Sequence, residues 1–195
     1  ASPRLDLLVN NAAIAFNNAP ARSANADGYE LQFVVNYLAG WILANRLLPN
    51  LGAAAPSRII NVASGSASAT DFDDVMLEQP DAHHRGYGQS KLAQVMMTAE
   101  LAPAFARHGV TMISLHPATL MDTTMVKGLG VPSRTTVAEG RDHVMGLIRA
   151  PLLQAGAYYR DGKSAPLTNP QADDAAARAR LAALSAELTG VPAAK

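Results

Sequence analysis

The chain has 195 residues, of which 49% are hydrophobic and 16% charged, so it can bury one hydrophobic core and has the composition of an ordinary globular protein. Sixteen basic and sixteen acidic residues cancel, so no excess charge attracts nucleic acid or an anionic membrane surface, and neither is expected as a partner. Cysteine is absent, no apolar run approaches the ~18 residues of a membrane-spanning helix, and residues 1–4 lack a signal-peptide pattern, so disulfides and thiolate chemistry are excluded and a soluble, cytoplasmic protein is expected.

The first predicted element is a strand over residues 5–10, where a near-continuous apolar run ends in two asparagines. Such a run is typical of a strand that is buried on both faces of a parallel sheet. Residues 14–26 are polar and rich in alanine and asparagine, which predicts a loop.

A long helix is expected next. Asp27 and Glu30 have the spacing of a capping box that starts it, and apolar residues then recur at helical spacing as far as Pro49. Asn36 lies inside this helix, on its predicted core side. From the residues alone, two interpretations stay open for it: a buried amide bonded to its neighbours, or a functional residue.

The second predicted strand leads to a candidate site. Ile59, Ile60 and Val62 form a short β-branched run, and Ser64 follows where that strand should end. In parallel α/β sheets this edge binds ligands. Gly52 to Ser57, before the strand, predicts a turn.

Tyr87 and Lys91 are four residues apart at the start of a helix predicted to run to about Arg107, so their side chains share one face. An ammonium group beside a phenol favours the phenolate and lowers its pKa. A hydroxyl such as that of Ser64 could bond the same substrate oxygen while the tyrosine exchanges the proton, which suits carbonyl reduction or alcohol oxidation. The same pair could equally lie on an exposed helix face.

Residues 70–86, between Ser64 and Tyr87, predict an irregular connection. They include clustered aspartates (71, 73 and 74) and the pair His83-His84, so a metal site has to be weighed. Adjacent histidines and clustered aspartates lack the spacing of metal ligands, which favours a solvated loop that walls the substrate cleft, and no metal is expected.

Residues 110–115 predict another buried strand, which ends at His116-Pro117-Ala118-Thr119. The next segment, residues 119–134, mixes methionine, valine and leucine with glycine and proline, as in a mobile lid with an apolar lining. That composition favours an apolar substrate.

The last third of the chain contains three further predicted elements. Thr136 and Glu139 predict the capped start of a helix, and residues 157–159 predict a final strand. Residues 171–189 predict a closing helix that Gly190 ends.

Five motifs occur in an order that resembles the short-chain dehydrogenase/reductase family, and within it the retinol-dehydrogenase-like branch. They are Leu8-Val9-Asn10-Asn11-Ala12-Ala13, Val35-Asn36, Asn61-Val62-Ala63-Ser64, Tyr87-x-x-x-Lys91 and His116-Pro117-Ala118. The resemblance implies an α/β fold of Rossmann-like type, with three αβα layers around a parallel sheet. It covers nearly the whole chain.

The resemblance also implies an enzyme and a role for each site residue. Tyr87 would act as acid or base, Lys91 would lower its pKa and bind the nicotinamide ribose, Ser64 would polarise the carbonyl, and Asn36 would hold a proton-relay water. NAD or NADP would be the cofactor and a small alcohol or carbonyl compound the substrate. The implied cofactor contacts, besides Tyr87 and Lys91, are Asn10, Asn11, Ala12, Pro117, Ala118 and Thr119, although Ala118 stands where the family has glycine.

The family begins with a strand and a glycine-rich turn that holds the cofactor pyrophosphate, and no such turn precedes residue 5. The resemblance therefore implies a single domain over residues 1–195 that corresponds to the C-terminal two-thirds of the family domain, truncated at its N-terminus. We expect weak cofactor binding and no dehydrogenase activity from this chain alone; the alternative is a non-catalytic fragment or interaction module. The resemblance also implies a homodimer that pairs the helices starting near Asp27 and Tyr87.

Overall fold

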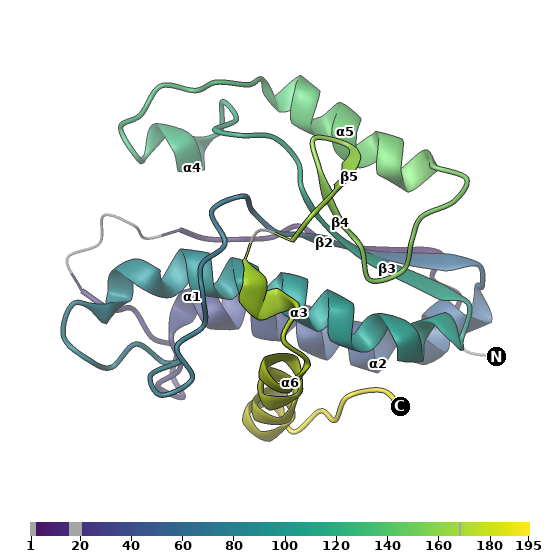
Figure 1. Cartoon of the computed structure of the whole chain (residues 1–195), viewed down its shortest axis with the longest axis horizontal. Coiled ribbons are helices and arrows are strands. Elements are labelled where there is room, and N and C mark those ends of the chain that lie inside the picture. Colours follow the sequence, from purple (N-terminus) through teal and green to yellow (C-terminus); the bar gives the residue numbers. More distant parts are fainter. Residues whose placement is uncertain (1–2, 16–20, 168) are drawn as a thin grey trace.

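In the computed structural model, which describes residues 3–15, 21–167 and 169–195, a five-stranded sheet lies between two layers of helices (Figure 1). The sheet order is β1-β2-β3-β4-β5; the first four strands are parallel and β5 is antiparallel to β4. The predicted three-layer α/β fold is confirmed. The strands are β1 (Leu7–Asn10), β2 (Ser57–Val62), β3 (Val110–His116), β4 (Tyr158–Arg160) and β5 (Lys163–Ala165).

The centre of the sheet is the pair β2 and β3, in which Ile60 lies opposite Ile113 and both are fully buried. Their β-branched side chains fit a strand covered on both faces. The strand β1 packs Leu8 against one helical layer and Val9 against the other, yet it is only half-buried. The prediction of full burial for residues 5–10 is wrong because β1 lies at the edge of the described sheet.

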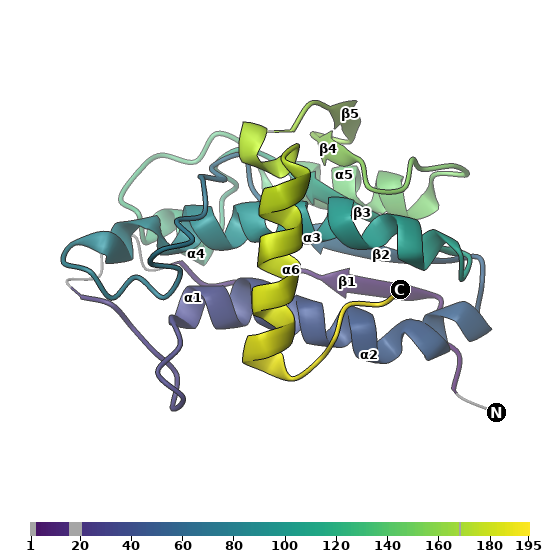
Figure 2. The ribbon, with the colours of Figure 1, turned by 60° about the horizontal axis from the view of Figure 1, so that its bottom comes forward.

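Helices cover both faces of the sheet, and none of those in the described residues is long and apolar enough to cross a bilayer. One layer contains the longest helices (Figure 1). The other packs Leu147 against the buried side chains of β2 and β3. The first layer consists of α1 (Leu31–Phe33), the π-helical turn η1 (Val34–Leu38), α2 (Ala39–Ala53) and α3 (Gly86–Ala106), and α6 (Ala175–Thr189) lies on its outer side (Figure 2). The second consists of α4 (Thr124–Lys127) and α5 (Val137–Arg149), and short 3-10 turns occur at η2 (Ala82–Arg85) and η3 (Pro170–Ala172).

Two boundaries of the first long helix differ from the prediction. Asp27 lies in a turn, and Glu30 is itself the N-cap, since its carboxylate accepts hydrogen bonds from the backbone N–H groups of residues 32 and 33. The helix also continues through Pro49 to Ala53, because Leu51 beyond the proline is fully buried in the core. The loop predicted over residues 14–26 is present where it is described, with residues 16–20 outside the described part.

The C-terminal third agrees with the prediction except at two places. The capping box of Thr136 and Glu139 starts α5, and Gly190 ends α6 at a φ of 64°. Helix α6 starts later than expected, with Asp174 as its N-cap, and the short strand β5 was not predicted. A strand of three residues carries too little period-two pattern to stand out from a turn.

Helix α6 crosses the outer side of α2 and α3 (Figure 2). The Tyr37 and Ser185 hydroxyls are 2.6 Å apart, and the Trp41 indole N–H donates to the Val191 carbonyl at 2.9 Å, so α6 and the segment after it are tied to the first long helix. This is the face that the resemblance assigned to a homodimer. In this chain α6 covers part of that face (Figure 2), and the homodimer stays a prediction.

Candidate active site

A cavity of about 570 Å³ opens at the carboxyl ends of the parallel strands. Asn11 and Ala12 reach it after β1, Ser64 after β2, and residues 117–119 after β3. Tyr87 and Lys91 reach it from the first turns of α3. The structure therefore brings most of the predicted site residues to one cavity, as expected for the strand edge of a parallel sheet.

Ser64 and Tyr87 are held against each other by close backbone packing. The Ser66 N–H donates to the Ser64 Oγ at 3.1 Å, and the Ser68 N–H donates to the Gly88 carbonyl at 3.0 Å. A Cβ on Gly88 would lie 3.0 Å from the Ser66 carbonyl oxygen and would displace the Ser68 hydroxyl, so glycine favours this approach of the helix to the loop. Burial raises the pKa of the Tyr87 phenol, and a hydrogen bond with Ser64 opposes that rise.

Lys91 is almost completely buried at 2% exposure, and its ammonium group donates to the Val62 carbonyl at 2.8 Å and to the Gln94 Oε1 at 3.0 Å. Burial lowers its own pKa to about 8. The Nζ is 5.7 Å from the centroid of the Tyr87 ring. The expected lowering of the Tyr87 pKa by Lys91 is wrong for this structure, because burial of the phenol is the largest influence and it acts upward.

Asn36 lies in the π-helical turn η1, where its side chain bonds Ile14 and Ser90. Its Nδ2 donates to the Ile14 carbonyl and to the Ser90 Oγ, both at 2.9 Å, and its Oδ1 accepts from the Ile14 N–H at 2.8 Å. It does not line the cavity. The interpretation as a buried amide bonded to its neighbours describes this geometry, and the relay role stays a prediction. A π-helical turn is often found at functional sites.

Asn10, unlike Asn11 and Ala12, points away from the cavity. Its Nδ2 donates to the Asn61 Oδ1 at 2.8 Å, and the Asn61 Nδ2 donates to the Thr98 Oγ1 at 2.9 Å. These bonds tie β1 to β2 and β2 to α3. Asn10 therefore supports the sheet and makes no contact with the cavity that was predicted to hold the cofactor.

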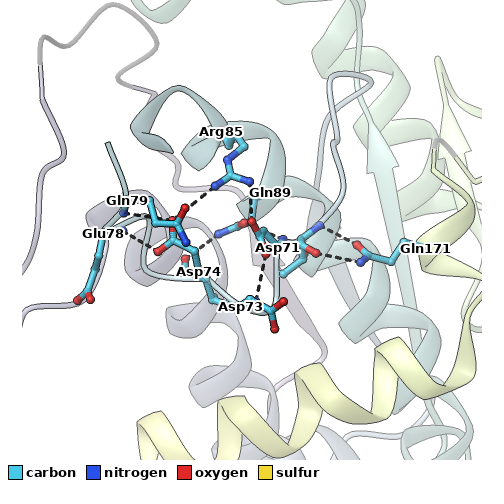
Figure 3. A network of polar contacts seen from close by, with 10 residues as sticks. Asp71, Asp73, Asp74, Glu78, Gln79, Arg85, Gln89 and Gln171 are labelled. Atoms are coloured by element: carbon cyan, nitrogen blue, oxygen red, sulfur yellow. Dashed lines mark hydrogen bonds and ion pairs between the residues drawn. The ribbon is translucent and has the colours of Figure 1, made fainter. Parts of the chain in front are cut away.

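The connection over residues 70–86 folds on itself through a polar network (Figure 3). Asp74 accepts hydrogen bonds from the N–H groups of residues 78 and 79, and Arg85 pairs with Asp71 at 2.8 Å and with Asp74 at 3.5 Å. Gln89 of α3 donates to the Val75 carbonyl at 2.7 Å. The prediction of a solvated loop is wrong for Asp74, which is 7% exposed. The prediction that this connection walls the substrate cleft is also wrong, because residues 70–86 do not line the cavity. Within the described residues, no group of three or more histidine, aspartate or glutamate side chains could hold a metal ion.

The far wall of the cavity is apolar, and the predicted lid supplies it. Its lining side chains include Leu120, Met121, Met125, Val126 and Leu129.

Two polar residues that line the cavity, His116 and Arg160, were not predicted as site residues from the sequence. His116 ends β3 and bonds the Thr119 Oγ1 at 3.1 Å, while Arg160 ends β4. Burial, followed by the nearby positive charge of Arg160, lowers the pKa of His116. The signal for Arg160 was present, since it follows a predicted strand at the same sheet edge.

Comparison with known proteins places these features in a family. The family model described as short chain dehydrogenase matches residues 1–131. Retinol dehydrogenase 13 of Homo sapiens is 34% identical over 97% of this chain and 62% of its own length. Retinol dehydrogenase 14 of Homo sapiens is 34% identical over 90% of this chain and 56% of its own length. The chain thus spans about three fifths of the length of these relatives.

Solved structures agree with this assignment. The NADPH-bound carbonyl reductase from chicken fatty liver has a TM-score of 0.64 and 27% identity, over 85% of this chain and 67% of that one. An uncharacterised protein of Mycobacterium paratuberculosis has a TM-score of 0.71 at 24% identity, over 97% of this chain and 69% of that one, which supports the fold alone. The chain belongs to the short-chain dehydrogenase family, in the branch that contains the retinol dehydrogenases.

Proposed function

We propose that this chain carries the catalytic site of an NAD(P)-dependent oxidoreductase that reduces a carbonyl group on an apolar substrate. The observation that carries the proposal is the meeting of Ser64, Tyr87 and Lys91 on one cavity at the carboxyl ends of the strands. A hydroxyl, a phenol and an ammonium group in one cavity suit proton transfer to a polarised carbonyl oxygen.

The cavity suits the nicotinamide end of a dinucleotide. Lys91 and the backbone around Asn11 and Thr119 would hold that end, since all three line the cavity. Bound there, the reduced nicotinamide supplies a hydride to the substrate carbon. The carbonyl reductase that resembles this chain was solved with NADPH, which supports a nicotinamide cofactor and leaves the choice between NAD and NADP to experiment.

Tyr87 is the proton donor in this proposal. Because burial raises its pKa, the phenol stays protonated at neutral pH and can give its proton to the carbonyl oxygen as the hydride arrives. Ser64 donates a hydrogen bond to the same oxygen and stabilises its developing negative charge. In the reverse reaction, alcohol oxidation, the same oxygen of Tyr87 would accept the proton from the substrate hydroxyl.

The substrate class follows from the lid side of the cavity. Met121, Met125 and Leu129 offer flexible apolar surface, which suits a long or bulky hydrocarbon group beside the carbonyl. The similar curated proteins are named retinol dehydrogenases, so retinal belongs among the test substrates.

The experiment is a carbonyl panel with NADPH and with NADH. It uses the 195-residue chain and, beside it, the chain preceded by the cofactor-binding segment of a relative. Retinal and long aliphatic aldehydes should be reduced faster than small polar aldehydes such as glyceraldehyde. Absence of turnover with every carbonyl and both cofactors, in a folded protein that binds cofactor, would overturn the proposal.

A further inference from the structure

The buried lysine of the site has an amide partner one turn further along its own helix. Gln94 is 1% exposed, and its Oε1 accepts a hydrogen bond from the Lys91 Nζ at 3.0 Å. We propose that Gln94 is a positioning residue, which keeps the Lys91 ammonium charged and aims it at the cavity. This inference rests on the proposed function, since it assigns Lys91 to the reacting site.

The number of hydrogens on the ammonium group explains why one N–H of Lys91 points at the cavity. An ammonium has three hydrogens to donate. In the described part of the chain, the Val62 carbonyl takes one at 2.8 Å and Gln94 takes another, which leaves the third for the cavity that Lys91 lines. Two fixed acceptors on the protein side therefore set the direction of the third hydrogen.

The backbone at Gln94 is itself fixed to the sheet. Its carbonyl accepts a hydrogen bond from the Thr98 Oγ1 at 2.8 Å, and Thr98 accepts from Asn61 of β2 at 2.9 Å. Asn61 is bonded in turn to Asn10 of β1 at 2.8 Å. A chain of hydrogen bonds from the sheet, through the buried Asn61 and Thr98, thus holds this turn of α3 in place, so the amide is positioned before any ligand binds.

The electrostatic role of Gln94 follows from the burial of Lys91. Burial alone favours the neutral amine and lowers the pKa to about 8. A carbonyl oxygen bonded to the ammonium favours the charged form and opposes that effect. Of the other ionisable groups, Tyr87 lies against Lys91 on α3, and His116 and Arg160 face the same cavity from β3 and β4.

The test is an NMR titration of Lys91 in protein labelled with ¹³C at the lysine ε carbon. The chain has four lysines, at positions 91, 127, 163 and 195, so the signals are few, and the Lys91 signal is the one lost in Lys91→Met. Gln94→Met keeps the length of the side chain and removes the acceptor, so the Lys91 midpoint should fall by about one unit or more. Gln94→Glu should raise it, because a carboxylate favours the ammonium.

The matched control is Gln89→Met. Gln89 is also fully buried on α3, but it bonds the Val75 carbonyl and the Asp71 N–H, so its loss should leave the Lys91 midpoint unchanged. General loosening of the helix would move both Gln94 variants in the same direction, and that result would overturn the proposal, as would an unchanged midpoint in Gln94→Met. The titration needs neither cofactor nor substrate, so it stands apart from the carbonyl panel that tests the proposed function.

Discussion

The burial of Lys91 predicts that the stability of the protein rises with pH in a window set by this one residue. Its pKa falls from the usual 10.5 to about 8 in the folded protein. Between those two values the unfolded chain binds more protons than the folded one, so the free energy of unfolding increases as the pH rises through the window. The stabilisation is complete above the unfolded pKa and is lost as the pH falls through about 8.

The magnitude follows from the two pKa values. The full shift corresponds to about 3 kcal/mol, and about 2 kcal/mol of it should develop between pH 7 and about pH 9.5. The window ends there because buried tyrosines act in the opposite direction at higher pH. Burial raises the pKa of Tyr87 and raises that of Tyr158 to about 12, so above about pH 10 these tyrosines ionise in the unfolded chain first and the free energy of unfolding falls as the pH rises.

The assay is urea unfolding of the wild type and of Lys91→Met at both pH values. The gain in the free energy of unfolding from pH 7 to about pH 9.5 should be about 2 kcal/mol smaller in the variant. Lys163→Met, which removes an exposed lysine of β5, is the matched control and should keep the wild-type pH dependence. Equal pH dependence in the wild type and Lys91→Met would refute the reasoning.

Three further perturbations test the packing around the site. Gly88→Ala should destabilise the protein by about 1–3 kcal/mol in urea unfolding, because its Cβ would lie 3.0 Å from the Ser66 backbone carbonyl and would displace the Ser68 hydroxyl. Gly146→Ala, with open space around it, should not destabilise the protein, and equal stability of the two variants would contradict the close approach. Asn61→Ala should lower the free energy of unfolding by about 2–4 kcal/mol in the same assay, since it leaves Asn10 and Thr98 without their buried partner. A loss below about 0.5 kcal/mol would argue against a stabilising role for these two hydrogen bonds. Removal of residues 175–195 should expose Tyr37 and Trp41 and increase association in light scattering; association unchanged by that removal would contradict the covering role of α6.

The reactive part of the site could be predicted because local periodicity determines it. The four-residue spacing of Tyr87 and Lys91 places both on one side of α3, and the β-branched run before Ser64 brings that serine to the strand edge. The capping box at Thr136 was predictable for the same reason, since a cap is a contact between near neighbours in sequence.

The remaining features depend on contacts between distant segments. The pKa of Tyr87 is governed by burial under elements that no spacing rule locates, so its direction was predicted wrongly. The covering of α2 and α3 by α6 joins Tyr37 to Ser185, 148 residues apart. Glu30 is an N-cap despite its poor preference for that position, because its carboxylate is buried at the helix start and bonded to two N–H groups there.

In the proposed reaction the Tyr87 hydroxyl gives its proton to the carbonyl oxygen, and Tyr87→Phe removes that hydroxyl while keeping the ring. Turnover and cofactor affinity would be measured with the best carbonyl substrate, on the chain preceded by a relative's cofactor-binding segment. Tyr159→Phe, which alters a buried tyrosine away from the cavity, is the control. Turnover should fall about 100-fold or more in Tyr87→Phe, with cofactor affinity unchanged and the control active. Turnover within a few-fold of the wild type would contradict proton transfer by Tyr87.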